Sequence, residues 1–251
     1  MRKVVELIKA QLSFFTIIPC RSRLSVVDAL SYVDISILTV SPIILTICCL
    51  PVFLLSYFKV LKNIELTSVL MYSSLLILTG MLHIDGLTDV VDALFTPREK
   101  RHQILKDPHI GAVGGAALFI VLTLGVVAVL SSRNILCSIW KIVLSELYSR
   151  LSCSMCARMG RPLHKGLGSI VIEGVSRRRH LIIVPIIVNI IASILILGYL
   201  KAIMYLVSTT LISYALIKIP VRALGGVSGD VLGYSIEIGR HISLITLTFI
   251  L

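Results

Sequence analysis

The sequence HIDGLTDVVD, residues 83–92, joins two long apolar segments of the chain. On an α-helix its three aspartates, Asp85, Asp89 and Asp92, stand at positions i, i+4 and i+7 and therefore share one narrow face. Three like charges on one face repel each other unless a cation lies among them. A hard cation such as Mg²⁺ binds oxygen ligands and can bridge carboxylates to phosphates. We interpret the cluster as a metal site rather than a solvated helix face, because only 13 of the 251 residues are acidic and the flanks are membrane-like.

The composition indicates an integral membrane protein. Hydrophobic residues make up 57% of the chain, and its mean hydropathy is +0.99, far above that of a soluble domain. About 20 apolar residues cross a bilayer, and we read apolar spans near 36–58, 65–82, 110–130, 135–156, 181–200, 202–217 and 233–251. We therefore predict an all-α fold: a single integral membrane domain over residues 1–251, a polytopic bundle of six to seven transmembrane helices. The amphipathic segment 2–18 predicts an additional interfacial helix at the N-terminus.

Basic residues are strongly biased to one side of this topology. If the N-terminus is cytoplasmic, 18 of the 24 Lys and Arg residues fall in cytoplasmic segments and four fall outside. Such a bias is typical of the cytoplasmic side of membrane proteins. Because 11 of the 13 acidic residues map to the same side, we predict a multi-pass protein of the cell membrane whose active site faces the cytoplasm. Membrane topology is sufficient to explain the positive charge, so we expect the lipid bilayer as a partner and no nucleic acid. The sequence leaves open whether the protein forms a homo-oligomer.

A second acidic motif stands near the C-terminus. The sequence GGVSGDVLG, residues 225–233, is followed by Glu237 and His241. Asp230, Glu237 and His241 are separated by seven and four residues and share a helix face. Glycines on or near that face let the backbone approach another helix or a nucleotide closely. We interpret this motif as part of the site, because an ordinary packing face of small residues would not need two carboxylates.

Several segments are candidates for binding phosphate. Arg150 follows Glu146 by four residues within a predicted span, where a structural ion pair is an equal alternative. The arginine run 177–179 either anchors the next span at anionic headgroups or attracts a polyanionic substrate. The glycines of segment 111–115 indicate either an anion-binding helix N-terminus or close helix packing.

These motifs, in this order, resemble those of the cobalamin synthase family, the adenosylcobinamide-GDP ribazoletransferases. The resemblance covers nearly the whole chain and rests on the following segments: QLSFFT at 11–16, H-x-D-G-L-x-D-x-x-D at 83–92, Lys106-Asp107, Ile110-Gly111, Ser149-Arg150, Gly166-Leu167-Gly168, and G-G-x-x-G-D-x-x-G at 225–233 with Glu237. The chain departs from the family pattern at Ala93, where glycine is usual, at Pro108-His109, where Ser-Arg is usual, and at His164-Lys165, where an acidic residue is frequent.

The resemblance implies a membrane enzyme that joins adenosylcobinamide-GDP to α-ribazole, or to its 5′-phosphate, with release of GMP and dependence on Mg²⁺. Displacement at a pyrophosphate phosphorus needs a metal to neutralise charge and orient the reacting groups. We predict these catalytic residues: Asp85, Asp89, Asp92, Asp230 and Glu237, the first three of them as Mg²⁺ ligands. We predict these contacts to substrate phosphate: Lys106, Arg150, Gly166, Gly168, Gly226 and Gly229.

Two other functions are weighed against this one. A CDP-alcohol phosphotransferase also uses an acidic membrane helix and Mg²⁺, but its signature has an Ala-Arg pair that is missing here and wider aspartate spacing. A cation-coupled transporter would place carboxylates near the bilayer midplane, often between inverted repeats. Here the acidic residues gather at one face, and only Glu146 lies deep in a span.

Overall fold

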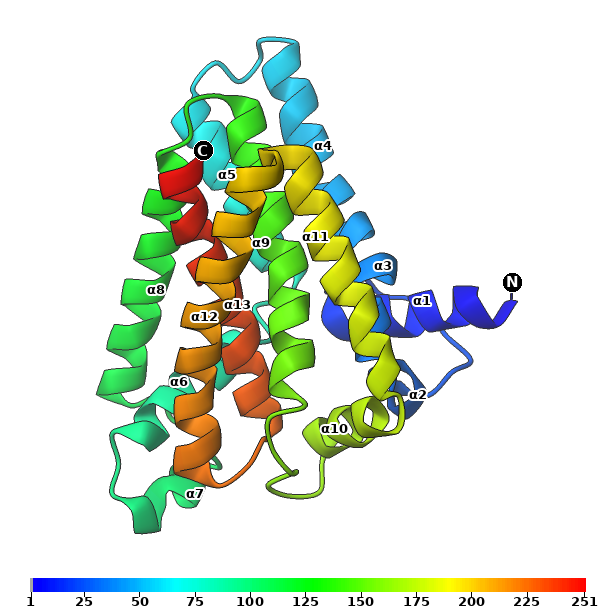
Figure 1. Cartoon of the computed structure of the whole chain (residues 1–251), viewed down its shortest axis with the longest axis vertical. Coiled ribbons are helices and arrows are strands. Elements are labelled where there is room, and N and C mark those ends of the chain that lie inside the picture. The colour runs from blue at the N-terminus through cyan, green and yellow to red at the C-terminus, as the bar shows by residue number, and fades with distance from the viewer. Residues whose placement is uncertain (1) are drawn as a thin grey trace.

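The computed structural model describes residues 2–251, which fold into an elongated bundle of helices (Figure 1). Its long helices are α4 (Ser41–Tyr57), α5 (Ile64–Leu78), α8 (Ala112–Leu130), α9 (Ile135–Cys156), α11 (Ile183–Leu197), α12 (Tyr199–Leu224) and α13 (Gly229–Ile250). Each overlaps one of the predicted apolar spans, although α12 begins three residues before and ends seven residues after the predicted span 202–217. The described residues form no sheet, only one isolated bridge between Pro162 and Val227. The prediction of an all-α polytopic fold is therefore confirmed.

Four segments are long and apolar enough to cross a membrane by length and composition alone: Val33–Tyr57, Ala112–Leu130, Arg179–Leu197 and Tyr199–Leu224. Helix α5 is shorter, with 15 residues. Helices α9 and α13 carry ionisable residues, among them Glu146 and Arg240, which are buried inside the bundle. Charged side chains in a membrane helix are tolerated where they face the interior and pair with each other.

Polar caps explain where several long helices begin. The side chains of Asn63, Asn134 and Ser228 accept hydrogen bonds from backbone N–H groups in the first turns of α5, α9 and α13, respectively. Helix α12 ends at Gly225, which takes a left-handed conformation with φ 83°. Glycine adopts this conformation readily because it has no Cβ.

The shorter elements are α1 (Arg2–Phe15), α2 (Val26–Leu30), η1 (Val33–Ile35), α3 (Ser36–Thr39), α6 (Ile84–Leu94), η2 (Arg98–Lys100), α7 (Arg101–Ile104), α10 (Leu167–Arg177) and η3 (Arg179–Ile182). Most of the shorter elements lie in the lower half of the bundle as drawn in Figure 1, whose bottom we call the lower end, whereas α1 and α3 lie near mid-height. Helix α1 projects sideways from the bundle (Figure 1) and buries only its inner face, including Leu12 and Phe15. This is the arrangement expected of an interfacial helix, although α1 ends at Phe15 rather than near residue 18.

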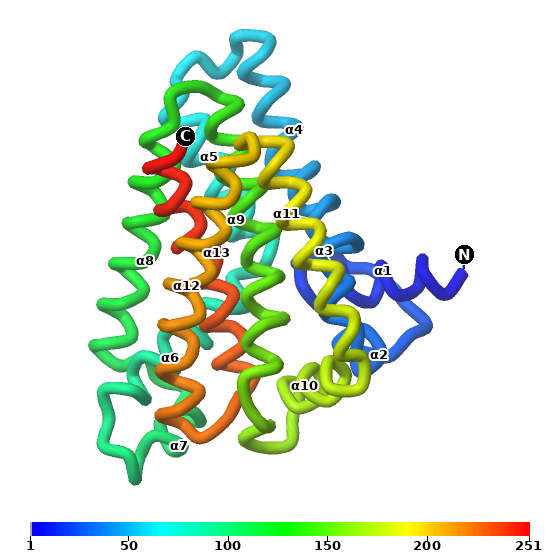
Figure 2. The backbone as a smooth tube through the Cα atoms, viewed as in Figure 1, coloured from blue at the N-terminus to red at the C-terminus, as the bar shows by residue number. Residues whose placement is uncertain are grey.

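The opposite end holds the C-terminus and the turns that join α4 to α5, α8 to α9, and α11 to α12 (Figure 2). Of the segments predicted to share one side of the membrane, 83–109, 157–180 and the first part of 218–241 lie toward the lower end, whereas the rest of 218–241 continues along α13 into the bundle. The cytoplasmic orientation of that end stays a prediction.

Candidate active site

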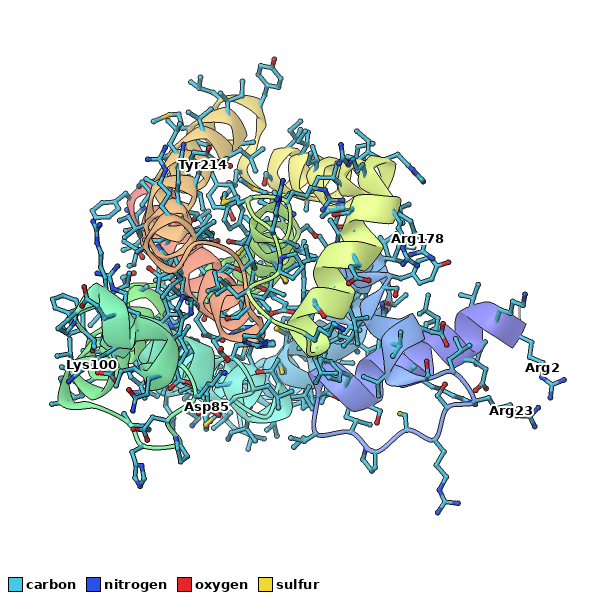
Figure 3. The ribbon with its side chains drawn as sticks, turned by 90° about the horizontal axis from the view of Figure 1, so that it is seen from below. Arg2, Arg23, Asp85, Lys100, Arg178 and Tyr214 are labelled. Carbon is cyan, nitrogen blue, oxygen red and sulfur yellow. The ribbon has the colours of Figure 1, made fainter. Side chains whose placement is uncertain are left out.

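Helix α6 presents the first acidic motif. Its opposite face buries Leu87 and Val90 in the core, so the face with Asp85, Asp89 and Asp92 is the more accessible one. Figure 3, which views the molecule from below, shows Asp85 on the same side of the molecule as Lys100 and farther from Arg178. The i, i+4, i+7 spacing thus forms the shared face that the sequence predicts.

The second acidic motif lies directly against the first. A Cβ on Gly86 of α6 would lie 2.5 Å from the carbonyl oxygen of Asp230, and a Cβ on Gly233 would lie 3.3 Å from the carbonyl oxygen of His83. The two glycines therefore let the first turns of α6 and α13 approach at backbone distance. This contact brings Asp230, which accepts a hydrogen bond from Ser228 Oγ at 3.1 Å, to the aspartates of α6.

The resulting group of carboxylates is crowded. Asp89 is half-buried, and its burial, followed by the negative charges of Asp230, Asp85 and Asp92, raises the pKa of its carboxyl to about 6. Carboxylates whose negative charges repel each other in this way favour either a shared proton or a bound cation. The donors are hard oxygens, which are the ligands that Mg²⁺ prefers. The residue types present therefore fit that ion, although no three His, Cys, Asp or Glu side chains in residues 2–251 are arranged in this structure so that they could hold a metal ion.

Asp92 has a second task. Its Oδ2 accepts the backbone N–H of Gly111 and its Oδ1 accepts that of Gly114, each at 2.8 Å, at the start of α8. The helix N-terminus that the sequence offered as an anion site is thus occupied by the chain's own carboxylate. Of the two alternatives for segment 111–115, the structure supports close packing, because a Cβ on Gly114 would collide with the Asp92 carboxylate.

The glycines proposed for phosphate binding divide into two groups. Gly168 at the start of α10 packs against the backbone of Gly229, and no Cβ would fit between them. Together with exposed Gly166, these residues lie where α10 and α13 begin. Gly226 is buried instead, and a Cβ there would lie 2.5 Å from the carbonyl oxygen of Arg161. Its role in this structure is to permit backbone pairing with the segment before α10.

The basic residues proposed for phosphate also differ in position. Lys106 is exposed between α7 and α8. Arg150 is 2% exposed, and its guanidinium stacks over the ring of Phe15, with 5.1 Å between Cζ and the ring centroid. The Arg150 Nε donates a hydrogen bond to Glu146 Oε1 at 2.9 Å. Arg150 therefore forms the structural ion pair that the sequence offered as an alternative to phosphate binding. Arg178 stacks over the ring of Tyr32 at 4.0 Å, which ties the arginine run to the first part of the chain.

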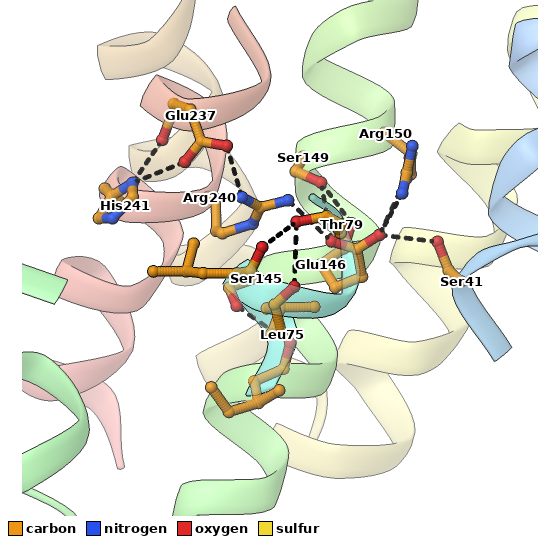
Figure 4. A network of polar contacts seen from close by, with 12 residues as sticks. Ser41, Leu75, Thr79, Ser145, Glu146, Ser149, Arg150, Glu237, Arg240 and His241 are labelled. Atoms are coloured by element: carbon orange, nitrogen blue, oxygen red, sulfur yellow. Dashed lines mark hydrogen bonds and ion pairs between the residues drawn. The ribbon is translucent and has the colours of Figure 1, made fainter. Parts of the chain in front are cut away.

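Glu237 and His241 are buried and belong to a network of polar contacts that includes Arg240 and Glu146 (Figure 4). Glu237 Oε1 accepts a hydrogen bond from Arg240 Nη1 at 2.6 Å, and Arg240 Nη2 donates to Glu146 Oε2 at 3.2 Å. His241 Nε2 is hydrogen-bonded to Tyr72 Oη at 2.6 Å. These contacts tie Glu237 to the buried network, and its action beside Asp230 stays a prediction.

Sequence reasoning missed two members of this buried network. Arg240 is fully buried and bridges Glu237 to Glu146, and Tyr72 closes the network on α5. The spacing of Arg240, three residues after Glu237 in a membrane helix, was the available signal. Nothing local marks Tyr72, because its partner lies 169 residues away.

The fold and the site together define a polytopic helical membrane protein with an acidic site at one end of its bundle. The sequence profile of the cobalamin-5-phosphate synthase family matches residues 7–248, and the chain belongs to this family. The family match does not favour the phosphotransferase and transporter alternatives.

Relatives named adenosylcobinamide-GDP ribazoletransferase support the same placement. The protein from Thermoplasma acidophilum is 29% identical over 239 residues, which cover 94% of this chain and 89% of the relative. The protein from Pyrobaculum calidifontis is 31% identical over 176 residues, 70% of this chain and 74% of the relative. The protein from Clostridium tetani is 28% identical over 182 residues, 70% of each chain. No solved structure matches the chain.

Proposed function

We propose that the chain is an adenosylcobinamide-GDP ribazoletransferase of the cell membrane. It joins adenosylcobinamide-GDP to α-ribazole, or to its 5′-phosphate, and releases GMP. Family membership and the printed names of the relatives support this activity. The observation that carries the site is the backbone contact between Gly86 and Asp230, which joins both acidic motifs in one cluster.

The reaction is a displacement at phosphorus. An oxygen of the ribazole substrate forms a bond to the phosphorus attached to the corrinoid, and the bond from that phosphorus to the bridging oxygen breaks, so that GMP leaves with the oxygen. Asp85 or Asp89 accepts the proton of the attacking hydroxyl. The backbone N–H groups at the starts of α10 and α13, near Gly168 and Gly229, are placed to approach phosphate oxygens.

The same carboxylates would hold Mg²⁺. Asp85 and Asp89 would supply carboxylate oxygens, Asp92 would add the lone pairs that its two backbone hydrogen bonds leave free, and Asp230 would add negative charge. When bound, the ion neutralises pyrophosphate charge and orients the nucleophile and the leaving group. The positive bias of the lower end supports its placement on the cytoplasmic side.

Purified protein in lipid vesicles tests the activity. Supplied with adenosylcobinamide-GDP, α-ribazole and Mg²⁺, it should release GMP in step with formation of the joined corrinoid. Asp85→Asn and Asp89→Asn keep the side-chain shape but remove the charge, so each should lower turnover by about 10²-fold or more, as for loss of a transition-state contact. The double variant should lose little more than either single variant, because the cluster works as a unit.

Glu99→Gln is the matched control, since Glu99 is exposed at the same end of the molecule. It should retain normal turnover. Near-normal turnover of both aspartate variants at limiting Mg²⁺ would disprove the assignment of the cluster. Absence of GMP release by well-folded wild-type protein would disprove the activity itself.

A further inference from the structure

A partly open recess of about 220 Å³ lies beside the acidic cluster. It is lined by helices that are far apart in the sequence. Helices α1, α10 and α13 supply most of its wall. The side chains that shape it are Phe14, Phe15, Val171, Leu232, Ile236 and His83. The wall is almost entirely apolar, although the recess adjoins the most polar part of the molecule.

The recess and the carboxylates share the same structural elements. Gly229 and Gly233 of α13 line the recess, and Asp230 stands between them in the sequence. His83 lines it from the start of α6, two residues before Asp85. A molecule held in the recess would therefore extend any polar part of its structure toward the reacting carboxylates.

His83 is the most polar side chain among the residues that line the recess. The residue is 8% exposed, and its Nε2 has no hydrogen-bond partner among the described residues. A buried polar atom without a partner costs free energy, on the order of 1–3 kcal/mol. Because Nε2 is itself buried, the recess presents an almost wholly apolar wall to a ligand.

The size of the recess limits the class of ligand. An engineered apolar cavity of about 150 Å³ holds benzene, so a recess of about 220 Å³ accommodates a fused bicyclic ring. A guanine base would also fit by volume, but it carries donors and acceptors around its whole edge. Buried against Phe14, Phe15 and Ile236, most of them would lack partners.

We propose that this recess binds the benzimidazole base of the ribazole substrate, with His83 in its wall, and that it thereby selects benzimidazoles over purines. This assignment rests on the proposed function and goes further, because it separates the two substrates in space. The guanosine diphosphate moiety is left to the open side of the carboxylate cluster.

Substitution within α10 tests the assignment. Val171→Phe fills the recess, whereas Ile170→Phe adds the same side chain at a neighbouring position that does not line it. We expect Val171→Phe to raise the KM for α-ribazole at least tenfold and to leave the KM for adenosylcobinamide-GDP within about twofold. Ile170→Phe should change neither. Equal effects of both variants, or a rise confined to adenosylcobinamide-GDP, would overturn the proposal.

Binding of α-ribazole alone, by calorimetry without the second substrate, separates this proposal from the proposed function. Wild-type protein should bind α-ribazole at least tenfold more tightly than the corresponding adenine riboside, and His83→Phe should reduce that preference. Val171→Ala provides a second readout should Val171→Phe fail to fold, since a larger recess should favour a base with bulkier ring substituents. Unchanged base preference in His83→Phe and Val171→Ala would contradict the proposal even if the wild type releases GMP.

Discussion

Asp92 is distinguished from Asp85 and Asp89 by its hydrogen bonds. Both of its oxygens accept backbone N–H groups of the α8 N-terminus, whereas Asp85 is exposed at the lower end. A carboxylate at a helix N-terminus is favoured by the unsatisfied N–H groups and by the helix dipole. One residue of the acidic face therefore also holds α6 to α8.

Asp92→Asn should consequently lower stability as well as turnover. An amide accepts through one oxygen only, so either the Gly111 or the Gly114 N–H loses its partner, at a cost of about 1–3 kcal/mol. Thermal unfolding in detergent should show a lower midpoint for Asp92→Asn and an unchanged midpoint for Asp85→Asn. Equal midpoints would show that the cap contributes nothing to stability.

At the scale of elements, the starts of α6, α10 and α13 meet through glycines. Gly86 meets the backbone of Asp230, and Gly168 meets that of Gly229. Contacts of this kind are common in membrane bundles, where small residues allow helices to pack closely. The arrangement of the acidic cluster therefore depends on glycines, which have no side chain and so allow these helices to approach closely.

Gly168→Ala should displace α10 from α13, because its Cβ would collide with the Gly229 backbone N. We expect a loss of turnover of about tenfold or more and a lower unfolding midpoint, since overpacking costs about 1–3 kcal/mol. Gly115→Ala in the first turn of α8 is the control, because the nearest atom to its Cβ is in the Ile110 side chain at 3.8 Å. Turnover and the unfolding midpoint should be measured for both variants. Equal turnover and equal midpoints in the two variants would contradict the packing argument.

The buried network joins α4, α9 and α13. Glu146 accepts hydrogen bonds from Arg150, Arg240 and Ser41 inside the bundle. Glu146→Gln should leave two buried guanidinium groups without their shared carboxylate, and breaking a buried pair costs about 3–5 kcal/mol. Glu65→Gln, at an exposed position in the first turn of α5, should cost less than about 1 kcal/mol. Detergent unfolding of the two variants gives the comparison, and a small loss for Glu146→Gln would mean that water replaces the carboxylate.

The whole molecule has two chemically different ends. The lower end gathers α6, α7, α10 and the start of α13, whereas short turns and the C-terminus form the other end (Figure 1). Enzymes that act on large charged substrates need the site at a water-facing end of the membrane domain. Orientation in the membrane then determines which compartment supplies the substrates.

Cysteine labelling of a variant that lacks native cysteines tests the orientation. Lys100→Cys at the lower end and Lys62→Cys at the opposite end both lie at exposed positions. Because positive loops remain in the cytoplasm, an impermeant reagent should label position 62 in intact cells and position 100 only after the membrane is opened. The reverse pattern would invert the topology.

The sequence by itself determined the helices and the face that carries Asp85, Asp89 and Asp92. Both are local properties, because the apolar length of a span and the i, i+4 spacing on a helix do not depend on distant residues. The placement of Asp230 beside α6, the capping of α8 by Asp92, and the burial of Glu237 with Arg240 were decided only by the tertiary structure. The first two contacts join different helices, and the third depends on which side of α13 faces the core. Helix packing, not local sequence spacing, determines both.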